Sequence, residues 1–234
     1  MSILSRALWR EIRRRPTQFL SVALVIALGV GLFSGSVDGY LNLTRSYEHL
    51  YDDLRLAHVT AIGGSPEEVL AAGEQMPTLT ASASRTVADV PFRPSAEHTM
   101  VGRAVGLPPS GHATVNDIEV IEGQTLDPAM PNGVVVEQHM AGHFDLDVGD
   151  TFEISTPEGW ETVEVLGVAA SPEYLWPAKS RQEILILPDE FGVVFAHEEF
   201  VSGLAASAQR HETLFRLEEG ASAQEVESAR EAAL

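Results

Sequence analysis

The chain has 234 residues, of which 44% are hydrophobic and 21% charged, the composition of a folded protein rather than of a disordered one. Its formal net charge is −19, and an acidic chain of this kind repels phosphate backbones, which argues against nucleic acid as a partner. No cysteine occurs in the sequence, so this chain forms no disulfide, thiolate metal site or cysteine nucleophile.

The first 15 residues differ in charge from the rest. They carry five arginines against one glutamate, a net charge of +4, which leaves −23 for the remainder of the chain. A basic segment of this kind suits the anionic surface of a membrane. We therefore predict that residues 1–16 form a basic amphipathic segment on the cytoplasmic side of a membrane.

Residues 17–40 are strongly apolar, and no charged side chain occurs between Pro16 and Val37. A helix rises 1.5 Å per residue, so this stretch spans roughly 30 Å, the thickness of the hydrocarbon core of a bilayer. The hydrophobic region of a signal peptide is usually only about 7–15 residues long. The length favours a transmembrane helix over 17–40, and the arginines before it place the N-terminus in the cytoplasm and the main domain outside it.

Two other interpretations of this stretch compete with a transmembrane helix. Gly29, Gly31 and Gly35 give G-x-G-x-x-x-G, which is one residue longer than the dinucleotide-binding fingerprint and lies inside an apolar run. The arginine pair at 14–15 is like the start of a twin-arginine export signal, but its spacing to the apolar run is wrong and no A-x-A cleavage site follows. A cleaved export signal is the main alternative to a membrane anchor.

Small residues recur at every fourth position of the predicted transmembrane helix, namely at Ala23, Ala27, Gly31, Gly35 and Gly39. Residues with this spacing lie close together on one helix face. A line of small side chains lets a second helix approach closely, although chance in an alanine- and glycine-rich helix is the alternative explanation. We expect Ala27, Gly31 and Gly35 to pack against a partner helix.

Helical spacing continues beyond the apolar stretch. Leucines and tyrosines follow one another at positions 43, 47, 50, 51 and 54. This spacing predicts a stalk helix over 41–55 that connects the transmembrane helix to the rest of the chain.

Two segments far apart in the chain share one strand–turn–helix pattern. Each has a short apolar strand, a glycine turn and a capping box that starts a helix. The first unit comprises residues 58–62, 63–64 and 65–68, and the second comprises residues 213–217, 220 and 222–225. Such units usually pair, so we predict an α/β lobe formed by 56–105 and 200–234.

The section between these two units is rich in strands and turns. Strands are predicted at 101–107, 134–136, 151–155, 162–168 and 183–187, and a short helix at 137–144. Gly149 and Asp150 predict a turn, and Gly167 predicts a bulge or a close backbone approach within a strand. The predicted fold class is therefore α+β, with a transmembrane helix and a stalk followed by an α/β lobe into which a β-rich lobe, residues 106–199, is inserted.

The order of these segments resembles a known family. The chain carries LSRALWREIRRRPTQFLSVALVIALGVGLFSG, then GVVVEQHMAGHFDLDVGDTFEI, then ETVEVLGVAASPEYLW, and finally LFRLEEGASAQEVESAREA. Together these look like the first transmembrane helix and the periplasmic core domain of FtsX/MacB-like ABC transporter permeases. The resemblance spans nearly the whole chain, and it implies an inner-membrane protein with a porter-like α/β lobe and an inserted β-rich lobe.

The resemblance also implies a function and partners. In this family the extracytoplasmic core domain couples motion driven by a separate cytoplasmic ABC ATPase to export or extraction of an envelope substrate, a mechanism called mechanotransmission. The implied partners are that ATPase subunit, further permease helices or a second permease copy, and the lipid membrane. Such permeases continue through at least three more membrane helices, so we expect this chain to be the N-terminal part of a longer or split permease that does not itself hydrolyse ATP.

Few side chains suggest chemistry of their own. His139 and His143 have a spacing that can bind zinc, but the glutamate of H-E-x-x-H and a third ligand are missing. Asp145, Asp147 and Asp150 fit a solvated turn better than a calcium loop, because the EF-hand register is absent. Neither G-x-S-x-G nor S-x-x-K occurs. We therefore predict no catalytic residue, metal or cofactor. The two histidines are expected to lie on the surface or to be hydrogen-bonded within the fold.

Tyr174 and Trp176 lie in a segment bounded by Pro172 and Pro177. They are either exposed contacts for a partner or an apolar substrate, or side chains that fold back over the β-rich lobe. Two further hypotheses for the whole chain stay open beside a permease. One is a single-span, membrane-anchored extracytoplasmic binding or scaffold domain, and the other is an exported enzyme.

Overall fold

The computed structural model describes residues 13–74, 76, 78–175, 189–218, 220–221, 225–226 and 228–229. The chain divides into two compact units, Met1–Leu50 and Tyr51–Leu234, and we refer to the second as the body. The predicted strand at 183–187, the first 12 residues of the predicted basic segment and most of the second capping box lie outside the described residues.

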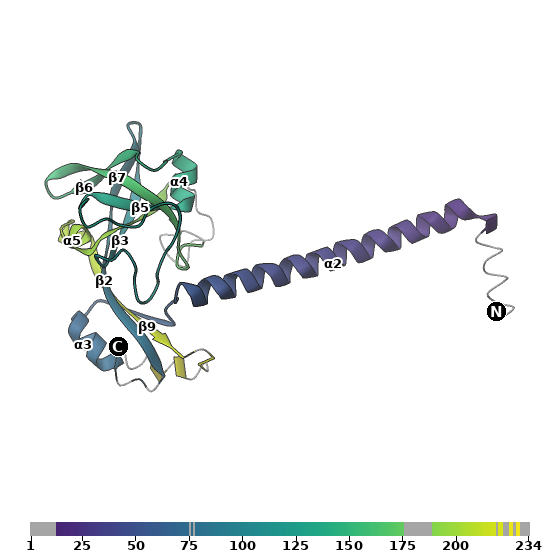
Figure 1. The fold of residues 1–234 in the computed structure, drawn as a ribbon, viewed down its shortest axis with the longest axis horizontal. Coiled ribbons are helices and arrows are strands. Elements are labelled where there is room, and N and C mark those ends of the chain that lie inside the picture. Colours follow the sequence, from purple (N-terminus) through teal and green to yellow (C-terminus); the bar gives the residue numbers. More distant parts are fainter. Residues whose placement is uncertain are drawn as a thin grey trace. The chain divides into compact units, whose positions relative to one another are not determined.

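Helix α2 (Pro16–Asp53) joins the predicted transmembrane helix and the predicted stalk into one continuous helix of 38 residues (Figure 1). Its part from Pro16 to Asn42 is long and apolar enough to cross a membrane. Proline suits the first position of a helix because the N–H that it lacks has no partner there. The hydroxyls of Ser21 and Ser36 each donate to the carbonyl four residues earlier, so these polar groups need no outside partner in lipid.

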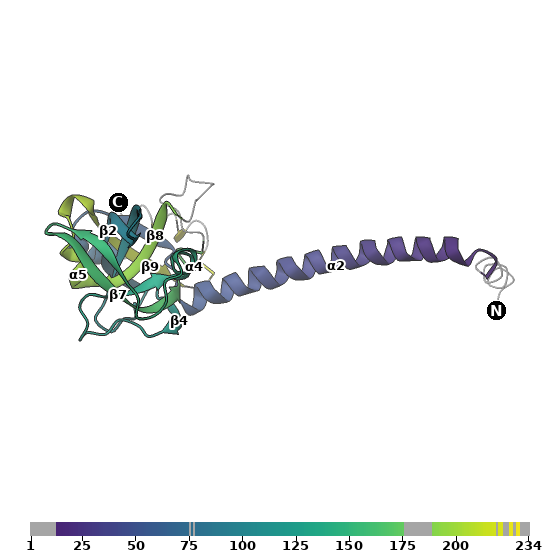
Figure 2. The same cartoon turned by 90° about the horizontal axis from the view of Figure 1, so that it is seen from above.

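The strands of the described chain form one nine-stranded sheet with the order β1-β9-β2-β3-β8-β5-β7-β4, and β6 pairs with β2 and β7 (Figures 1 and 2). The strands are β1 (Val59–Ile62), β2 (Leu79–Ser95), β3 (His98–Leu107), β4 (Glu119–Gly123), β5 (Gly133–Glu137), β6 (Thr151–Thr156), β7 (Gly159–Ala170), β8 (Phe191–His197) and β9 (Gln209–Leu217). The short helices are α3 (Pro66–Gly73), α4 (Gln138–Phe144), α5 (Glu198–Ser202) and the 3-10 helix η1 (Ala206–Ala208). The predicted α+β class is confirmed.

Strand β2 connects the two parts of the body. Its first half pairs with β9 as far as Ala88, and its second half pairs with β3 and, from Phe92 onward, with β6. Pro91, which has no N–H to donate, lies where β2 changes from one partner to the other on that side. Figure 1 shows β2 running from α3 and β9 at one end of the body toward β6 and β7 at the other.

Alternation along β2 separates two hydrophobic cores. Ala88, Val90 and Phe92 are buried in a large core that also contains side chains from β5, β6, β7, β8 and α4. Val87 faces the opposite side, where it packs in a second core with side chains from β3, β5, β8 and the segment after β7. Both faces of the central strands are therefore covered.

A third, smaller core holds the two predicted strand–turn–helix units together. Its buried members are Val59, Met76, Phe215, Leu217 and Ala229. Strands β1 and β9 pair antiparallel with Val59 opposite Phe215, so the strands of the two units lie side by side as predicted. The predicted boundary after residue 105 falls inside β3 and the one after residue 199 falls inside α5, and the division into lobes stays a prediction.

The capping box predicted at residues 65–68 does not form, because the Ser65 side chain makes no capping hydrogen bond. Ser65 is the residue before α3, as predicted. Pro66 at the first helical position already removes one N–H, and Glu67 and Glu68 place negative charge near the positive end of the helix dipole. Helix α3 therefore begins at the predicted residue, but Pro66 and the two glutamates favour this start rather than a Ser65 cap.

The two glycine predictions are confirmed. A Cβ at Gly167 in β7 would lie 2.8 Å from the carbonyl oxygen of Glu122 and closer still to that of Gln124, and the register with β5 shifts at this point. Gly149 has φ +93, and the Asp150 carboxylate accepts from the Asp147 N–H at 2.9 Å, which closes the predicted turn.

Candidate functional site

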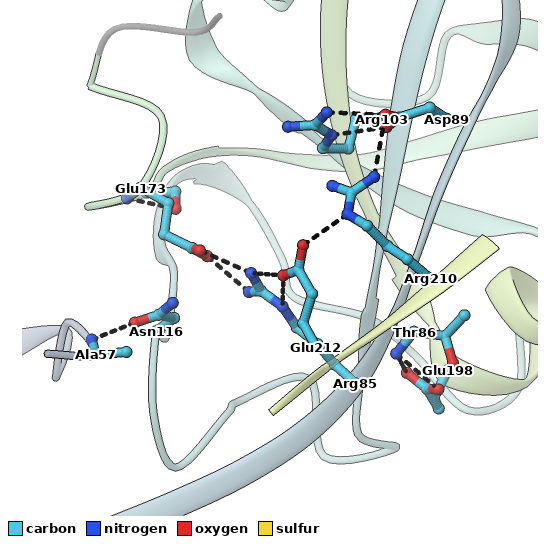
Figure 3. A network of polar contacts seen from close by, with 11 residues as sticks. Ala57, Arg85, Thr86, Asp89, Arg103, Asn116, Glu173, Glu198, Arg210 and Glu212 are labelled. Atoms are coloured by element: carbon cyan, nitrogen blue, oxygen red, sulfur yellow. Dashed lines mark hydrogen bonds and ion pairs between the residues drawn. The ribbon is translucent and has the colours of Figure 1, made fainter. Parts of the chain in front are cut away.

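A network of buried and half-buried charged side chains lies on one face of the sheet where β9, β2 and β3 adjoin (Figure 3). Its members are Arg85 and Asp89 on β2, Arg103 on β3, Arg210 and Glu212 on β9, and Glu173 in the segment after β7. Cross-strand register produces this cluster, because Arg85 lies directly opposite Glu212 and Asp89 lies directly opposite Arg103. Three arginines therefore meet three carboxylates.

Arg85 is the centre of this network. Its guanidinium donates to both oxygens of Glu173 at 2.6 and 2.7 Å, and to Glu212 Oε2 at 2.6 and 3.1 Å. The Arg85 side chain is only 7% exposed. Burial by itself would lower the pKa of Arg85, but the Glu173 and Glu212 carboxylates more than offset this and raise it above its ordinary value. Arg85 therefore stays charged inside the body.

The other half of the network saturates the remaining carboxylate oxygens. Arg103 donates to the two oxygens of Asp89 at 2.7 and 2.8 Å, and Arg210 bridges Asp89 at 3.0 Å and Glu212 at 2.9 Å. Burial alone would raise the pKa of Glu212, but Arg85 and Arg210 lower it below its ordinary value. Because each acid is paired with an arginine, the network provides charge-assisted bonding between elements rather than a free acid or base for catalysis.

The network holds the segment that follows β7 in place. Tyr174 is 6% exposed and packs edge-on against Phe195 with ring centroids 6.2 Å apart. Burial raises the pKa of its hydroxyl above the ordinary value. The Tyr174 ring is therefore packed in the second core rather than exposed. Trp176 lies outside the described residues.

A second polar cluster lies where helix α2 enters the body. Arg55 follows the end of the helix and donates to the carbonyl oxygen of Ala113 at 2.7 Å and to Asp117 Oδ2 at 2.8 Å. The N–H of Asp117 in turn donates to the carbonyl oxygen of Leu54 at 2.9 Å. These bonds attach residues 54–55 to the loop between β3 and β4.

Asn116 completes this attachment. Its side-chain oxygen accepts from the Ala57 N–H at 2.6 Å (Figure 3), and its own N–H donates to the carbonyl oxygen of Arg55 at 3.0 Å. Arg55 and Asn116 both have φ +55, a backbone conformation that is uncommon outside glycine and that asparagine tolerates well. These backbone conformations let residues 55–57 and the β3–β4 loop form hydrogen bonds with each other.

Strand β9 attaches the same region from another side. Arg216 donates to the carbonyl oxygen of Tyr51 and to Asp52 Oδ1, both at 3.2 Å. The last turn of α2 is thus bonded to β9, while the residues just after it are bonded to the β3–β4 loop. We use the name junction for Tyr51–His58 together with strand β9 and the β3–β4 loop, to which these residues are bonded.

The other residues singled out in the sequence lie apart from both clusters. The Nδ1 of His139 bonds to the buried Glu137 carboxylate at 2.7 Å, and the His143 ring packs edge-on against Phe144. Within the described residues, no group of three or more histidine and acidic side chains is placed to hold a metal ion. Around Gly31 and Gly35 of α2 no other atom lies within 4 Å of an added Cβ, so this face is open.

Known proteins show only a distant structural likeness to this chain. No protein-family model matches the chain, and a search of curated proteins finds no match. The extracellular domain of the ABC-type transporter YknZ from Gram-positive bacteria is similar, with 14% identity, 73% of this chain and 88% of that chain covered, and a TM-score of 0.43. A domain of a Porphyromonas gingivalis protein described as a permease has 12% identity, 75% of each chain covered and a TM-score of 0.40. A likeness this loose carries no assignment of function.

Proposed function

We propose that this chain is the N-terminal part of an ABC transporter permease. Its N-terminus lies in the cytoplasm, residues 17–40 cross the inner membrane, and the body lies outside the cytoplasm. The observation that supports this most is the continuity of α2, which runs from the apolar segment without a break to residues bonded within the body. An apolar helix that continues into such a stalk is typical of an anchor rather than of a removable leader.

In this proposal the body couples motion driven by a separate cytoplasmic ABC ATPase to the export or extraction of an envelope substrate. The sequence resemblance to FtsX/MacB-like permeases is the ground for this step. The junction provides a physical route, because displacing residues 51–57 strains hydrogen bonds both to β9 and to the β3–β4 loop. Movement of the helix end would thus reach two different elements of the body.

The proposed assembly needs partners on both sides of the membrane. Further permease helices or a second copy would pack on the face of Ala27, Gly31 and Gly35, which is open in this chain. On the outer side, the segment with Tyr174 and Trp176 is proposed to contact a partner or an apolar substrate. Burial of Tyr174 gives it the role of anchoring that segment. The alternative function is a single-span anchored binding or scaffold domain, which would need no ATPase.

Replacing Gly31 with leucine is expected to disrupt this assembly. The epitope-tagged full chain is purified in mild detergent from its own host, and ATP hydrolysis is measured in the purified sample against a tag-only purification. A leucine on the small-residue face blocks close helix packing, so Gly31→Leu should lower the recovered ATP hydrolysis roughly tenfold. Gly29→Leu is the matched control, because residue 29 lies about 200° around the helix from residue 31.

Two results would contradict the proposal in different ways. If the wild-type chain recovers no ATP hydrolysis above the tag-only level, the scaffold alternative is favoured. If Gly31→Leu and Gly29→Leu recover equal amounts, the proposed packing face is wrong. Both glycines have open space around them in the chain itself, so neither leucine introduces a clash within it.

A further inference from the structure

His58 lies between the end of α2 and the start of β1, and it is bonded to β9 twice. Its backbone N–H donates to the carbonyl oxygen of Phe215 at 2.9 Å. Its ring Nδ1 lies 3.2 Å from the backbone nitrogen of Leu217 and accepts that N–H. A backbone N–H can only donate, so this bond requires an unprotonated Nδ1. A proton on Nδ1 would replace an attraction with two opposed N–H groups.

The charges around His58 oppose its protonation. The charged groups that act on its ring are Arg216 on β9 and Asp52 on α2. Burial and then Arg216 lower the pKa of His58, while Asp52 acts in the opposite direction. The same Arg216 bonds Asp52 and the carbonyl oxygen of Tyr51. A protonated His58 would therefore place a second cation beside the arginine that holds the last turn of α2.

The attachment of the junction to the β3–β4 loop responds differently to acid. The bonds of Asn116 to Ala57 and Arg55 involve amide and carbonyl groups, which do not titrate. Nδ1 of His112 lies 3.4 Å from Asp117 Oδ2, the oxygen that also accepts from Arg55. The backbone N–H of Asp117 also donates to the carbonyl oxygen of Leu54 at 2.9 Å, a bond between groups that do not titrate.

We propose that the junction is an acid-responsive latch, in which protonation of His58 releases residues 51–58 from β9 while their attachment to the β3–β4 loop persists. The inference concerns residues within the body alone, so it does not depend on the transport proposal. The stabilisation of the latch by unprotonated His58 is complete above about pH 6.5, where histidine in the unfolded chain is neutral. It is lost as pH falls from about 6.5 through the lower pKa of folded His58, because the unfolded chain binds the proton before the folded chain does.

Hydrogen exchange of the Leu217 amide tests this latch. The full chain in detergent micelles is measured by NMR at pH 7.5 and pH 5.5, with each rate normalised to the intrinsic rate at that pH. Loss of one hydrogen bond should raise the normalised exchange of Leu217 about five- to tenfold at pH 5.5. The Ala57 amide, held by the Asn116 side chain, should keep its protection at both pH values.

The variant His58→Asn keeps an acceptor near the Leu217 amide and removes the titration. Its Leu217 exchange should not depend on pH, whereas the matched control His143→Asn, on an exposed helical position, should respond to acid as the wild type does. The latch would be refuted if Leu217 is equally protected at both pH values in the wild type, or if His58→Asn keeps the acid response. A titration of the His58 ring in the wild type that does not coincide with the Leu217 shift would refute it as well.

Discussion

Replacing Arg85 with methionine is expected to lower the free energy of unfolding by about 3–5 kcal/mol. The change leaves the Glu173 and Glu212 carboxylates, whose side chains are 17% and 8% exposed, without their shared guanidinium. Glu212 keeps its bond to Arg210, but Glu173 loses both of its guanidinium bonds and becomes an uncompensated charge with little access to water. The measurement is urea denaturation of the full chain in detergent, followed by circular dichroism.

Arg93 on the same strand supplies the matched control. It pairs with Glu153 at 2.8 Å, but both side chains are about one-third exposed, so water screens the pair. Arg93→Met should therefore cost only about 1 kcal/mol or less. Equal losses for Arg85→Met and Arg93→Met would show that burial of the network has no energetic consequence. Adding Glu173→Gln to Arg85→Met should recover part of the loss, because the unpaired charge of Glu173 is then gone.

Replacing Phe92 with alanine should also destabilise the body by about 3–5 kcal/mol, through the lost burial and the cavity that remains. Its ring is fully buried, lies against Gly102 of β3 so closely that a Cβ there would overlap it, and is 6.0 Å from the Phe152 ring. Strand pairing holds Gly102 and Phe152 in place, so the space does not close by local collapse. The same urea titration measures the effect.

Trp160 is the control for this second prediction. It is 40% exposed and stacks under the Arg93 guanidinium, 3.8 Å from the ring centroid. Trp160→Ala removes a larger ring that is partly exposed, so the loss should be smaller than for Phe92→Ala, about 1–2 kcal/mol. A smaller loss for Phe92→Ala than for Trp160→Ala would contradict the placement of the large core.

The sequence predicts those parts of the fold whose signals are local. An uninterrupted apolar run predicts α2, and the paired strand–turn–helix units predict the contact of β1 with β9. Gly167 predicts a bulge or a close backbone approach, and carbonyl oxygens do lie close to where its Cβ would be. In each case the information lies within about 20 neighbouring residues or in one residue with a special backbone requirement.

Strands β2 and β8 were not predicted, each for a physical reason. In β2, Pro91 and the charged residues Arg85 and Asp89 interrupt the apolar alternation that identifies a strand, because one face of β2 carries the charged network. Strand β8 is buried at every position from Phe191 to His197, so its sequence shows no alternation at all. Both patterns become clear only once the neighbouring strands are in place.

The charged network and the junction were also missed, because their partners are far apart in the chain. Arg85 is 88 residues from Glu173 and 127 from Glu212, so no motif spacing links them. At the junction, the left-handed backbone positions are Arg55 and Asn116 rather than glycines, so the usual sign of a special turn is absent at Arg55. The residues around Arg85, from Ser82 to Thr86, are small and polar, so nothing local in the sequence indicates that this arginine is buried.

The membrane arrangement is the central claim, and single-cysteine labelling tests it most directly. Because the chain contains no cysteine, Ser2→Cys and Glu158→Cys each introduce a single thiol, the second on the exposed turn between β6 and β7. With a membrane-impermeant maleimide on intact spheroplasts, we predict labelling of Glu158→Cys, labelling of Ser2→Cys only after lysis, and retention of both in membranes extracted with alkali. A Glu158→Cys chain that stays unlabelled until lysis, or an alkali-soluble product shortened at its N-terminus, would contradict an anchored extracytoplasmic domain.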